Sequence, residues 1–159
     1  MGKSGEWWEK VFKGITNLNL DGKGRLAMPT RHRAAFAAEE GQMVMTIDAQ
    51  ERCLLIYPLS TWLIIEPQID ALPSFNAQAN RVKRMLIGHA TELTLDSAGR
   101  ILVPTELRNH AELDKEVVLV GQGKKLELWS QPNWVAQTEV FLSESNDKDL
   151  PAALEAISL

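Results

Sequence analysis

TNLNLDGKGRLAMPT, residues 16–30 of a chain of 159 residues, recurs 75 residues later as TELTLDSAGRILVPT, residues 91–105. Both copies share the pattern T-x-L-x-L-D-x-x-G-R and then P-T-x-x-R, which ends at Arg33 and Arg108. So many matches at one offset are not explained by chance. A repeat of this kind determines the fold class more strongly than any other sequence signal. The chain therefore contains two related halves.

Each half begins with the local signals of a β-hairpin. Leu18 and Leu20 alternate with polar residues, as in a strand buried on one face, and Leu26 and Met28 resume the alternation. The D-x-x-G-R segment between them predicts a tight turn, because the Asp side chain accepts backbone N–H groups and the Gly tolerates positive φ. The proline that follows in both halves ends the second strand and permits a short helix to begin.

The repeat continues at slightly smaller offsets. Residues 44–47 match residues 117–120, residues 54–57 match residues 126–129, and Trp62 matches Trp134. The pattern of each half therefore predicts a strand, a tight turn, a strand, a short helix, a hairpin of two strands and a final helix. We expect Trp62, Trp129 and Trp134 to pack in the core, because the repeat gives them equivalent places.

Two helices are predicted between the halves. Apolar spacing favours a helix over residues 61–72, which Pro67 should kink or split. A second helix is predicted over residues 76–87, with Gly88 as its stop. The tail after Trp134 should begin as a helix, become acidic, and carry a short amphipathic piece over residues 150–157.

Composition narrows the function classes. The chain is 45% apolar and 24% charged, as in ordinary globular proteins. Its single Cys53 cannot form an internal disulfide, so a reducing cytosolic setting is expected. His32, His89 and His110 show no metal-ligand spacing, and we find no catalytic constellation and no Gly-rich phosphate loop. We therefore expect no enzyme activity, no metal, no cofactor and no membrane contact, since no apolar stretch approaches the roughly 20 residues of a span.

Charge is distributed unevenly along the chain. The net charge is −4, but residues 11–34 hold five bases and one acid, a local charge of +4. Residues 139–159 hold five acids and one base, a local charge of −4. The basic segment, residues 11–34, provides a local positive field of the kind that attracts nucleic acid. The alternative interpretation is that these charges form an ordinary solvated surface.

The size of each half indicates how the halves combine. A unit of about 55–60 residues made of short strands buries little core by itself. An intertwined arrangement, in which the hairpins of each half complete the sheet of the other, hides more strand edges. We place the boundaries at 1–10 (N-terminal extension), 11–64 (first repeat), 65–87 (helical connector), 88–136 (second repeat) and 137–159 (acidic C-terminal tail).

These motifs resemble one family. VFKG at residues 11–14, LDGKGRL at residues 20–26 and LDSAGRI at residues 95–101 are similar to the MraZ family of bacterial transcriptional regulators. Each half resembles the swapped-hairpin domain of AbrB and SpoVT, and the likeness covers about residues 11–134. The fold class is then α+β, mainly β: two tandem AbrB-like repeats forming an intertwined swapped-hairpin barrel with peripheral helices.

The resemblance implies a cytoplasmic, nucleoid-associated protein that binds double-stranded DNA and assembles into a homo-oligomeric ring. It implies repression of the division and cell-wall gene cluster at whose head the protein is encoded, through G-rich promoter repeats. The chain departs from the family pattern at Pro67 and in the ten residues before Val11, where members usually begin with Met.

The first turn supplies the predicted DNA contacts. The planar guanidinium fork of Arg25 can bind a guanine edge or a phosphate, and we expect it to contact DNA. The alternative role of Arg25 is a purely intramolecular ion pair with Asp21. Lys23 at the turn tip and Lys13 on the first strand suit phosphate contacts, and Asp21 should orient the turn. The full predicted set is Arg25, Lys23, Lys13, Asp21, Arg31 and Arg33.

The second turn is a weaker candidate. Its Asp96 and Arg100 match the first turn, but Ala98 replaces Lys23 and Glu106 replaces Arg31. We expect the second repeat to support the fold or a subunit contact. A competing function is an antitoxin-like or structural interaction module without direct DNA readout. Two features argue against it, namely the two fused copies and the absence of an extended toxin-wrapping tail.

The first ten residues have a second interpretation. Trp7-Trp8-Glu9 must be encoded by TGGTGGGAR, which is G-rich like the promoter repeats that the resemblance implies. We hypothesise that residues 1–10 are operator and ribosome-binding sequence read as protein, with a GTG start at Val11. The alternative is an ordinary extension whose paired tryptophans pack on the barrel.

Overall fold

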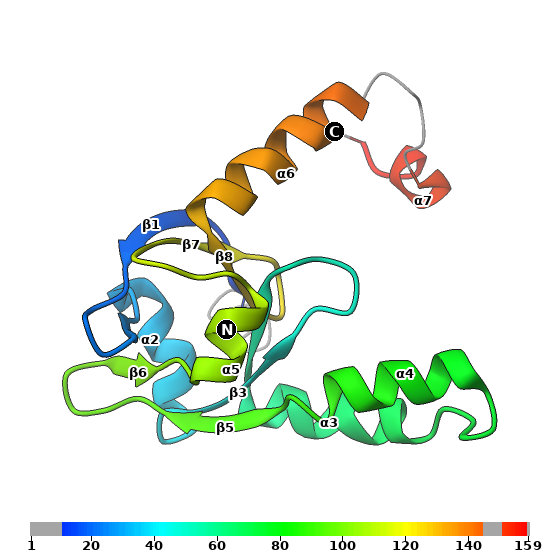
Figure 1. The fold of residues 1–159 in the computed structure, drawn as a ribbon, viewed down its shortest axis with the longest axis horizontal. Helices are drawn as coiled ribbons and strands as arrows, with labels where there is room; N and C mark the ends of the chain where they lie inside the picture. The colour runs from blue at the N-terminus through cyan, green and yellow to red at the C-terminus, as the bar shows by residue number, and fades with distance from the viewer. Residues whose placement is uncertain (1–10, 145–150, 159) are drawn as a thin grey trace.

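In a computed structural model, which describes residues 11–144 and 151–158, the chain is mainly antiparallel sheet with helices around it (Figure 1). Six strands form one sheet in the order β1-β7-β8-β4-β3-β5, and β2 pairs with β6. The strands are β1 Ile15–Asn19, β2 Arg25–Ala27, β3 Gln42–Ile47, β4 Leu54–Pro58, β5 Thr91–Thr94, β6 Arg100–Leu102, β7 Glu116–Gly121 and β8 Leu126–Ser130. The helices are α2 Thr30–Ala37, α3 Leu59–Asp70, α4 Ala77–Leu86, α5 Thr105–His110, α6 Gln131–Glu144 and α7 Ala152–Glu155.

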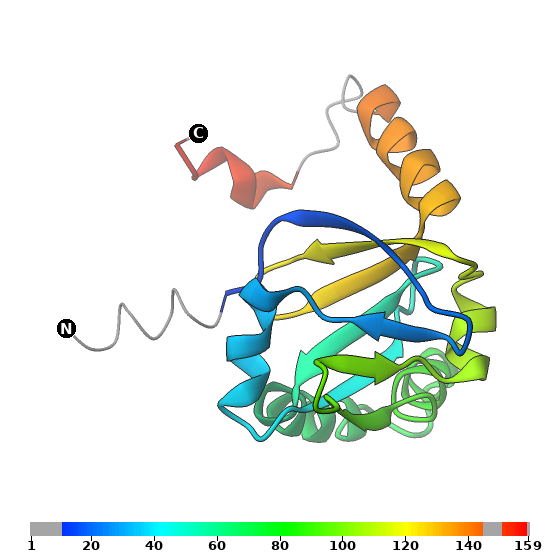
Figure 2. The ribbon, with the colours of Figure 1, turned by 90° about the vertical axis from the view of Figure 1, so that its left-hand side faces the viewer.

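The two halves exchange their first strands. Strand β1 of the first half pairs with β7 of the second, and β5 of the second half pairs with β3 of the first. The second strands of the two halves, β2 and β6, lie side by side, with Leu26 opposite Ile101 (Figure 2). Neither half therefore has a complete sheet without the other.

The predicted barrel is not closed. Strands β1 and β5 are the two edges of the six-stranded sheet, and among the described residues no ladder joins them. The prediction was wrong because β2 and β6, each three residues long, pair only with one another. They form a separate two-stranded sheet that does not bridge the edges, so the architecture is an open sheet with a short ribbon over it.

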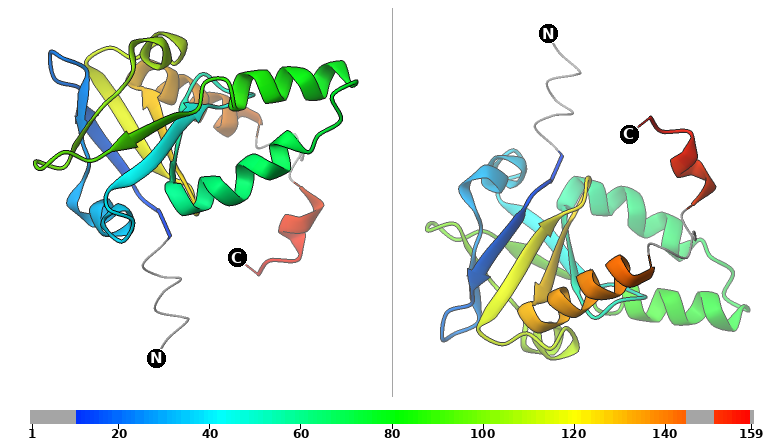
Figure 3. Two further views of the ribbon diagram at one scale, coloured as in Figure 1. Left: turned by 90° about the horizontal axis from the view of Figure 1, so that it is seen from below. Right: turned by 90° about the horizontal axis from the view of Figure 1, so that it is seen from above.

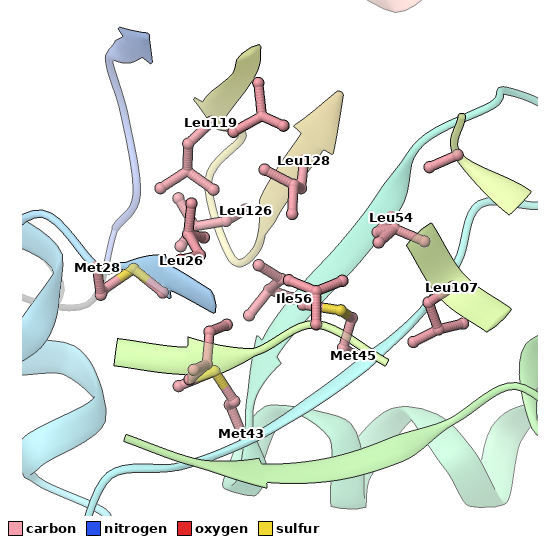
Figure 4. Close-up of a cluster of buried hydrophobic side chains, with 14 of the residues drawn as sticks. Leu26, Met28, Met43, Met45, Leu54, Ile56, Leu107, Leu119, Leu126 and Leu128 are labelled. Atoms are coloured by element: carbon pink, nitrogen blue, oxygen red, sulfur yellow. The ribbon is translucent and has the colours of Figure 1, made fainter. Parts of the chain in front are cut away.

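The central strands of the large sheet, β3, β4, β7 and β8, are buried on both faces. One face, together with the ribbon, encloses an apolar cluster that includes Leu26, Met45, Ile56 and Leu128 (Figure 4). The opposite face packs Val44, Leu55, Tyr57, Trp62, Val118 and Trp129 into a second cluster, as the alternation of side chains along a strand requires.

The predicted packing of the tryptophans is confirmed. Trp62 and Trp129 are buried, and Trp134 is half-buried against the second cluster. Tyr57 and Trp62 have ring centroids 5.5 Å apart, and the equivalent Trp129 and Trp134 have centroids 5.6 Å apart.

The helical connector differs from its prediction at one point. Helix α3 runs unbroken with Pro67 inside it, so the predicted split does not occur. Pro67 is exposed, and its missing N–H removes only one backbone bond of a twelve-residue helix. Helix α4 begins after Asn76, whose side chain accepts the N–H groups of Gln78 and Ala79, and this prediction is confirmed.

Two helical regions lie at the periphery of the sheet (Figure 3). Helices α3 and α4 form one region, and α6 leaves the sheet at a separate place. Helix α6 confirms the helical start of the tail, and α7 falls within the predicted amphipathic piece. Asp147 and Asp149 of the acidic stretch lie outside the described residues, as does the extension 1–10. Within the described part of the chain, no helix is both long and apolar enough to span a membrane.

Candidate nucleic-acid interface

The first turn is held by the carboxylate of Asp21. Its Oδ1 accepts the backbone N–H groups of Lys23 at 3.0 Å and Arg25 at 2.8 Å, and its Oδ2 accepts Nε of Arg25 at 2.7 Å. The N–H of Gly24 donates to the Asp21 carbonyl at 2.9 Å, and Gly24 has a φ of +83°. The D-x-x-G-R segment thus forms the tight turn that the sequence predicts.

The carboxylate is charged at any physiological pH. The backbone N–H of Arg25 contributes most to lowering the pKa of Asp21 to about 2, and the Arg25 side chain lowers it further. The intramolecular pair considered as the alternative role for Arg25 is therefore present in the structure. It engages Nε, so the fork of the two Nη groups lies outside this ion pair, on a side chain that is 30% exposed.

The second turn has the same geometry. Oδ1 of Asp96 accepts the N–H groups of Ala98 and Arg100, both at 2.9 Å, and Oδ2 accepts Nε of Arg100 at 3.1 Å. The backbone N–H of Arg100 contributes most to lowering the pKa of Asp96. The two turns differ in the side chains around them, because Lys23 is exposed at the first tip and Ala98 at the second.

The other three predicted residues are not gathered at the first turn. Lys13 is exposed at the opposite end of β1, next to Phe12, which pairs with Gly123. Arg31 is exposed, and its Nη2 donates to Thr16 Oγ1 in β1. Both cations therefore lie beside the start of β1, a strand length from the turn.

Arg33 belongs to the second turn. Its Nε donates to the Met28 carbonyl at 2.8 Å, and its guanidinium lies against Gly99. The structure thus brings together Arg25, Lys23 and Asp21 and disperses Lys13, Arg31 and Arg33.

Sequence reasoning missed one residue of the first turn. Arg108, on α5 of the second repeat, places its guanidinium against Gly24. The signal was present in the shared pattern, whose last position is arginine in both halves. The strand exchange that brings each arginine to the opposite turn is not visible in either copy alone.

A second grouping was also missed. Oxygen and sulfur atoms of Asp48, Cys53 and Glu127 lie within 4.8 Å of one another. Burial, and then the charge of Glu127, raise the pKa of the Cys53 thiol, while Glu127 accepts the indole N–H of Trp129 at 3.0 Å. We assign no ion to this cluster.

The fold and its paired turns define a tandem-repeat protein that is mainly antiparallel sheet. The model of a family described as "MraZ protein, putative antitoxin-like" matches residues 11–85 and again residues 86–156. The chain therefore belongs to the MraZ family, as the resemblance in its motifs indicated.

Individual relatives agree. A protein of Legionella pneumophila (strain Corby) is 48% identical over 152 residues, which cover 94% of this chain and all of the relative. A protein of Marinomonas sp. (strain MWYL1) is 50% identical over 141 residues, 88% of this chain and 93% of the relative. A protein of Pectobacterium atrosepticum is 48% identical over 152 residues, again 94% and 100%. Each of the three is named "Transcriptional regulator MraZ", and none is named for an enzymatic activity.

Proposed function

We propose that this protein is a transcriptional regulator that binds double-stranded DNA sequence-specifically through its first turn. The observation that carries the proposal is the Asp21–Arg25 pair at 2.7 Å, which fixes a half-buried guanidinium in the same turn as the exposed Lys23. Relatives named as transcriptional regulators support the proposal.

The chemistry of the turn suits a base contact. A guanidinium fork reads the O6 and N7 acceptors of guanine in the major groove, whereas a lysine supplies phosphate contact. Asp21 orients Arg25 before binding, so less side-chain entropy is lost in the complex. Its own charge faces the turn's N–H groups, which spares it close repulsion by phosphates.

We propose that the protein acts as a homo-oligomer. Apolar side chains are exposed on two separate helices, Ile64 on α3 and Phe141 on α6 among them. A contact between two different surfaces of identical chains is head-to-tail, and such contacts form a ring when the rotation closes. We expect Phe141→Glu to lower the assembly mass in light scattering, and an unchanged mass would contradict this surface.

We propose further that the regulator is cytoplasmic and nucleoid-associated, and that it represses its own division and cell-wall gene cluster at G-rich promoter repeats. The family membership supports these assignments. It also supports an interpretation of the exchanged β1 and β5 strands as the swapped-hairpin arrangement of the AbrB type.

The second candidate is an antitoxin-like or structural interaction module without direct DNA readout. The matching family is described as "antitoxin-like", which favours this candidate. The two functions differ in whether the purified chain binds DNA by itself.

A gel shift separates them. The probe is the duplex upstream of this protein's own gene, and the control is a scrambled duplex of equal length. We expect a retarded complex with the upstream duplex at concentrations that leave the scrambled duplex free. Equal binding to both duplexes, or to neither, would contradict sequence-specific DNA binding.

A further inference from the structure

Each turn is covered by an arginine of the other repeat. A methyl group built on Gly24 would lie 2.6 Å from Cζ and Nη1 of Arg108. One built on Gly99 would lie 2.5 Å from Cζ of Arg33. Both glycines are buried although they sit in turns whose tips are exposed. The guanidinium groups therefore lie directly against the glycines, and a larger residue at either position would have to displace them.

The same glycines are held at a second point. The N–H of Val103 donates to the Gly24 carbonyl at 3.0 Å, and the N–H of Met28 donates to the Gly99 carbonyl at 2.9 Å. Val103 and Arg108 belong to the second repeat, so they fix Gly24 of the first turn from its carbonyl and from its Cα. The residue after Gly24 is Arg25, whose direction follows from this fixed backbone.

The two arginines are not held equally. Arg33 donates Nε to the Met28 carbonyl at 2.8 Å, whereas Nε of Arg108 is buried without a partner among the described residues. Arg108 is otherwise attached through Nη2 to Thr105 Oγ1 at 2.9 Å. A buried polar group that forgoes a hydrogen bond calls for an explanation, and the close fit of this guanidinium to Gly24 supplies one.

We propose that Arg108 is a positioning residue for the DNA-binding turn of the opposite repeat. The proposal rests on the proposed function. The first tip contains two glycines, Gly22 and Gly24, and glycine loses the most backbone freedom when it is ordered. A guanidinium packed on Gly24 orders the tip before DNA arrives, so binding does not bear that entropic cost.

The test uses the full chain and the duplex upstream of its gene. We expect Arg108→Ala to weaken binding about tenfold, a change of about 1.4 kcal/mol. The slope of log K against log[salt] should stay that of the unsubstituted chain, because no phosphate contact is lost. Lys23→Ala should instead lower that slope by about 1. A lowered slope for Arg108→Ala would make Arg108 a direct contact and overturn the proposal.

Arg33→Ala is the matched control, because it removes the equivalent guanidinium from the second turn. We expect it to destabilise the fold at least as much as Arg108→Ala in thermal melting, because the hydrogen bond to Met28 is lost as well. It should change DNA affinity less than about threefold, since the structure places Arg33 at the second turn, which lacks a cationic tip, and not at the first. Equal losses of affinity in the two variants would reduce Arg108 to a fold-stabilising residue.

Arg108→Lys keeps the charge and loses the planar face. We expect its affinity to match that of Arg108→Ala, and full recovery by lysine would contradict positioning by packing. If the unsubstituted chain does not bind the upstream duplex, the proposed function fails. If it binds and Arg108→Ala binds equally, only the inference about Arg108 fails.

Discussion

The two turns of this protein have one geometry and two chemical settings. In both, an aspartate accepts two backbone N–H groups and the Nε of an arginine four residues on, with Nε distances of 2.7 Å and 3.1 Å. At their tips, however, the first turn has Lys23 where the second has Ala98.

This difference distinguishes the residues that form the turn from the residues that would bind a ligand. The Asp–Gly–Arg skeleton is common to both turns and is satisfied internally, so it serves the turn itself. The lysine at the tip is found in the first turn alone, and the second turn forms without it. The proposed function therefore assigns the DNA contact to the first turn, and the predictions below test that distinction.

The largest expected effect is on Arg25. We expect Arg25→Ala to weaken specific DNA binding at least about a hundredfold, because a bidentate base contact and its phosphate neighbours are lost together. Arg100→Ala, in the equivalent position, should weaken it less than about threefold. Gel shifts measure both, with thermal melting as the folding control. Similar losses in the two variants would contradict a functional difference between the turns.

The next effect concerns the number of turns engaged. If each chain offers one cationic turn, it reaches few base pairs, and a net charge of −4 adds little non-specific attraction. Affinity must then come from several chains held at high effective concentration. We expect binding to fall at least about tenfold when the operator is cut from several repeats to one, and to fall with added salt. Equal affinity for a single repeat would refute this arrangement.

A smaller effect follows from transferring the charge. Ala98→Lys with Glu106→Arg gives the second repeat the side chains that the first has at the turn tip and on the short helix. We expect the double variant to bind DNA severalfold more tightly and to steepen the salt slope by about 1 for each new phosphate contact. Ala98→Gln with Glu106→Gln is the control, because it removes the acid without adding cations. No gain in slope would show that the second turn cannot reach DNA.

The repeats also differ at one buried position in their short helices. His32 in α2 is 4% exposed, and burial, followed by the nearby charge of Arg31, lowers its pKa to about 4. The equivalent residue in α5 is Leu107, also buried. The histidine therefore stays neutral in the folded protein at pH values where an unfolded chain, with a pKa near 6.5, already takes up a proton.

The sign of the effect follows from that depressed pKa. Stability is unaffected above pH 6.5 and falls as the pH drops toward 4, by about 2 kcal/mol at pH 5. We expect His32→Leu, which copies the second repeat, to remove this part of the acid sensitivity. Urea denaturation at pH 5 and pH 7.5 measures it. The same loss of stability in both proteins would show that His32 does not contribute.

Local features could be predicted from the sequence. The turns, the start of α4 at Asn76 and the place of Trp129 depend on short-range chemistry or on the repeat itself. Closure of the barrel was predicted wrongly, because it depends on where β2 and β6 point after their turns. The packing of Arg108 on Gly24 depends on strand exchange, which joins residues 84 positions apart. Neither the barrel closure nor the packing of Arg108 can be predicted from the sequence of one half alone.

The smallest effect is expected where the repeats have no counterpart at all, in residues 1–10. The family model begins at residue 11, and the Legionella pneumophila relative is covered over its whole length by 94% of this chain. We therefore expect a chain that lacks residues 1–10 to match the full chain in melting temperature and in affinity for the upstream duplex. Val11 has a GTN codon, so a GTG start there would give the native chain. Mass spectrometry of the N-terminal peptide from the protein's own cell measures this, and a native chain that starts at Met1 would refute the GTG start.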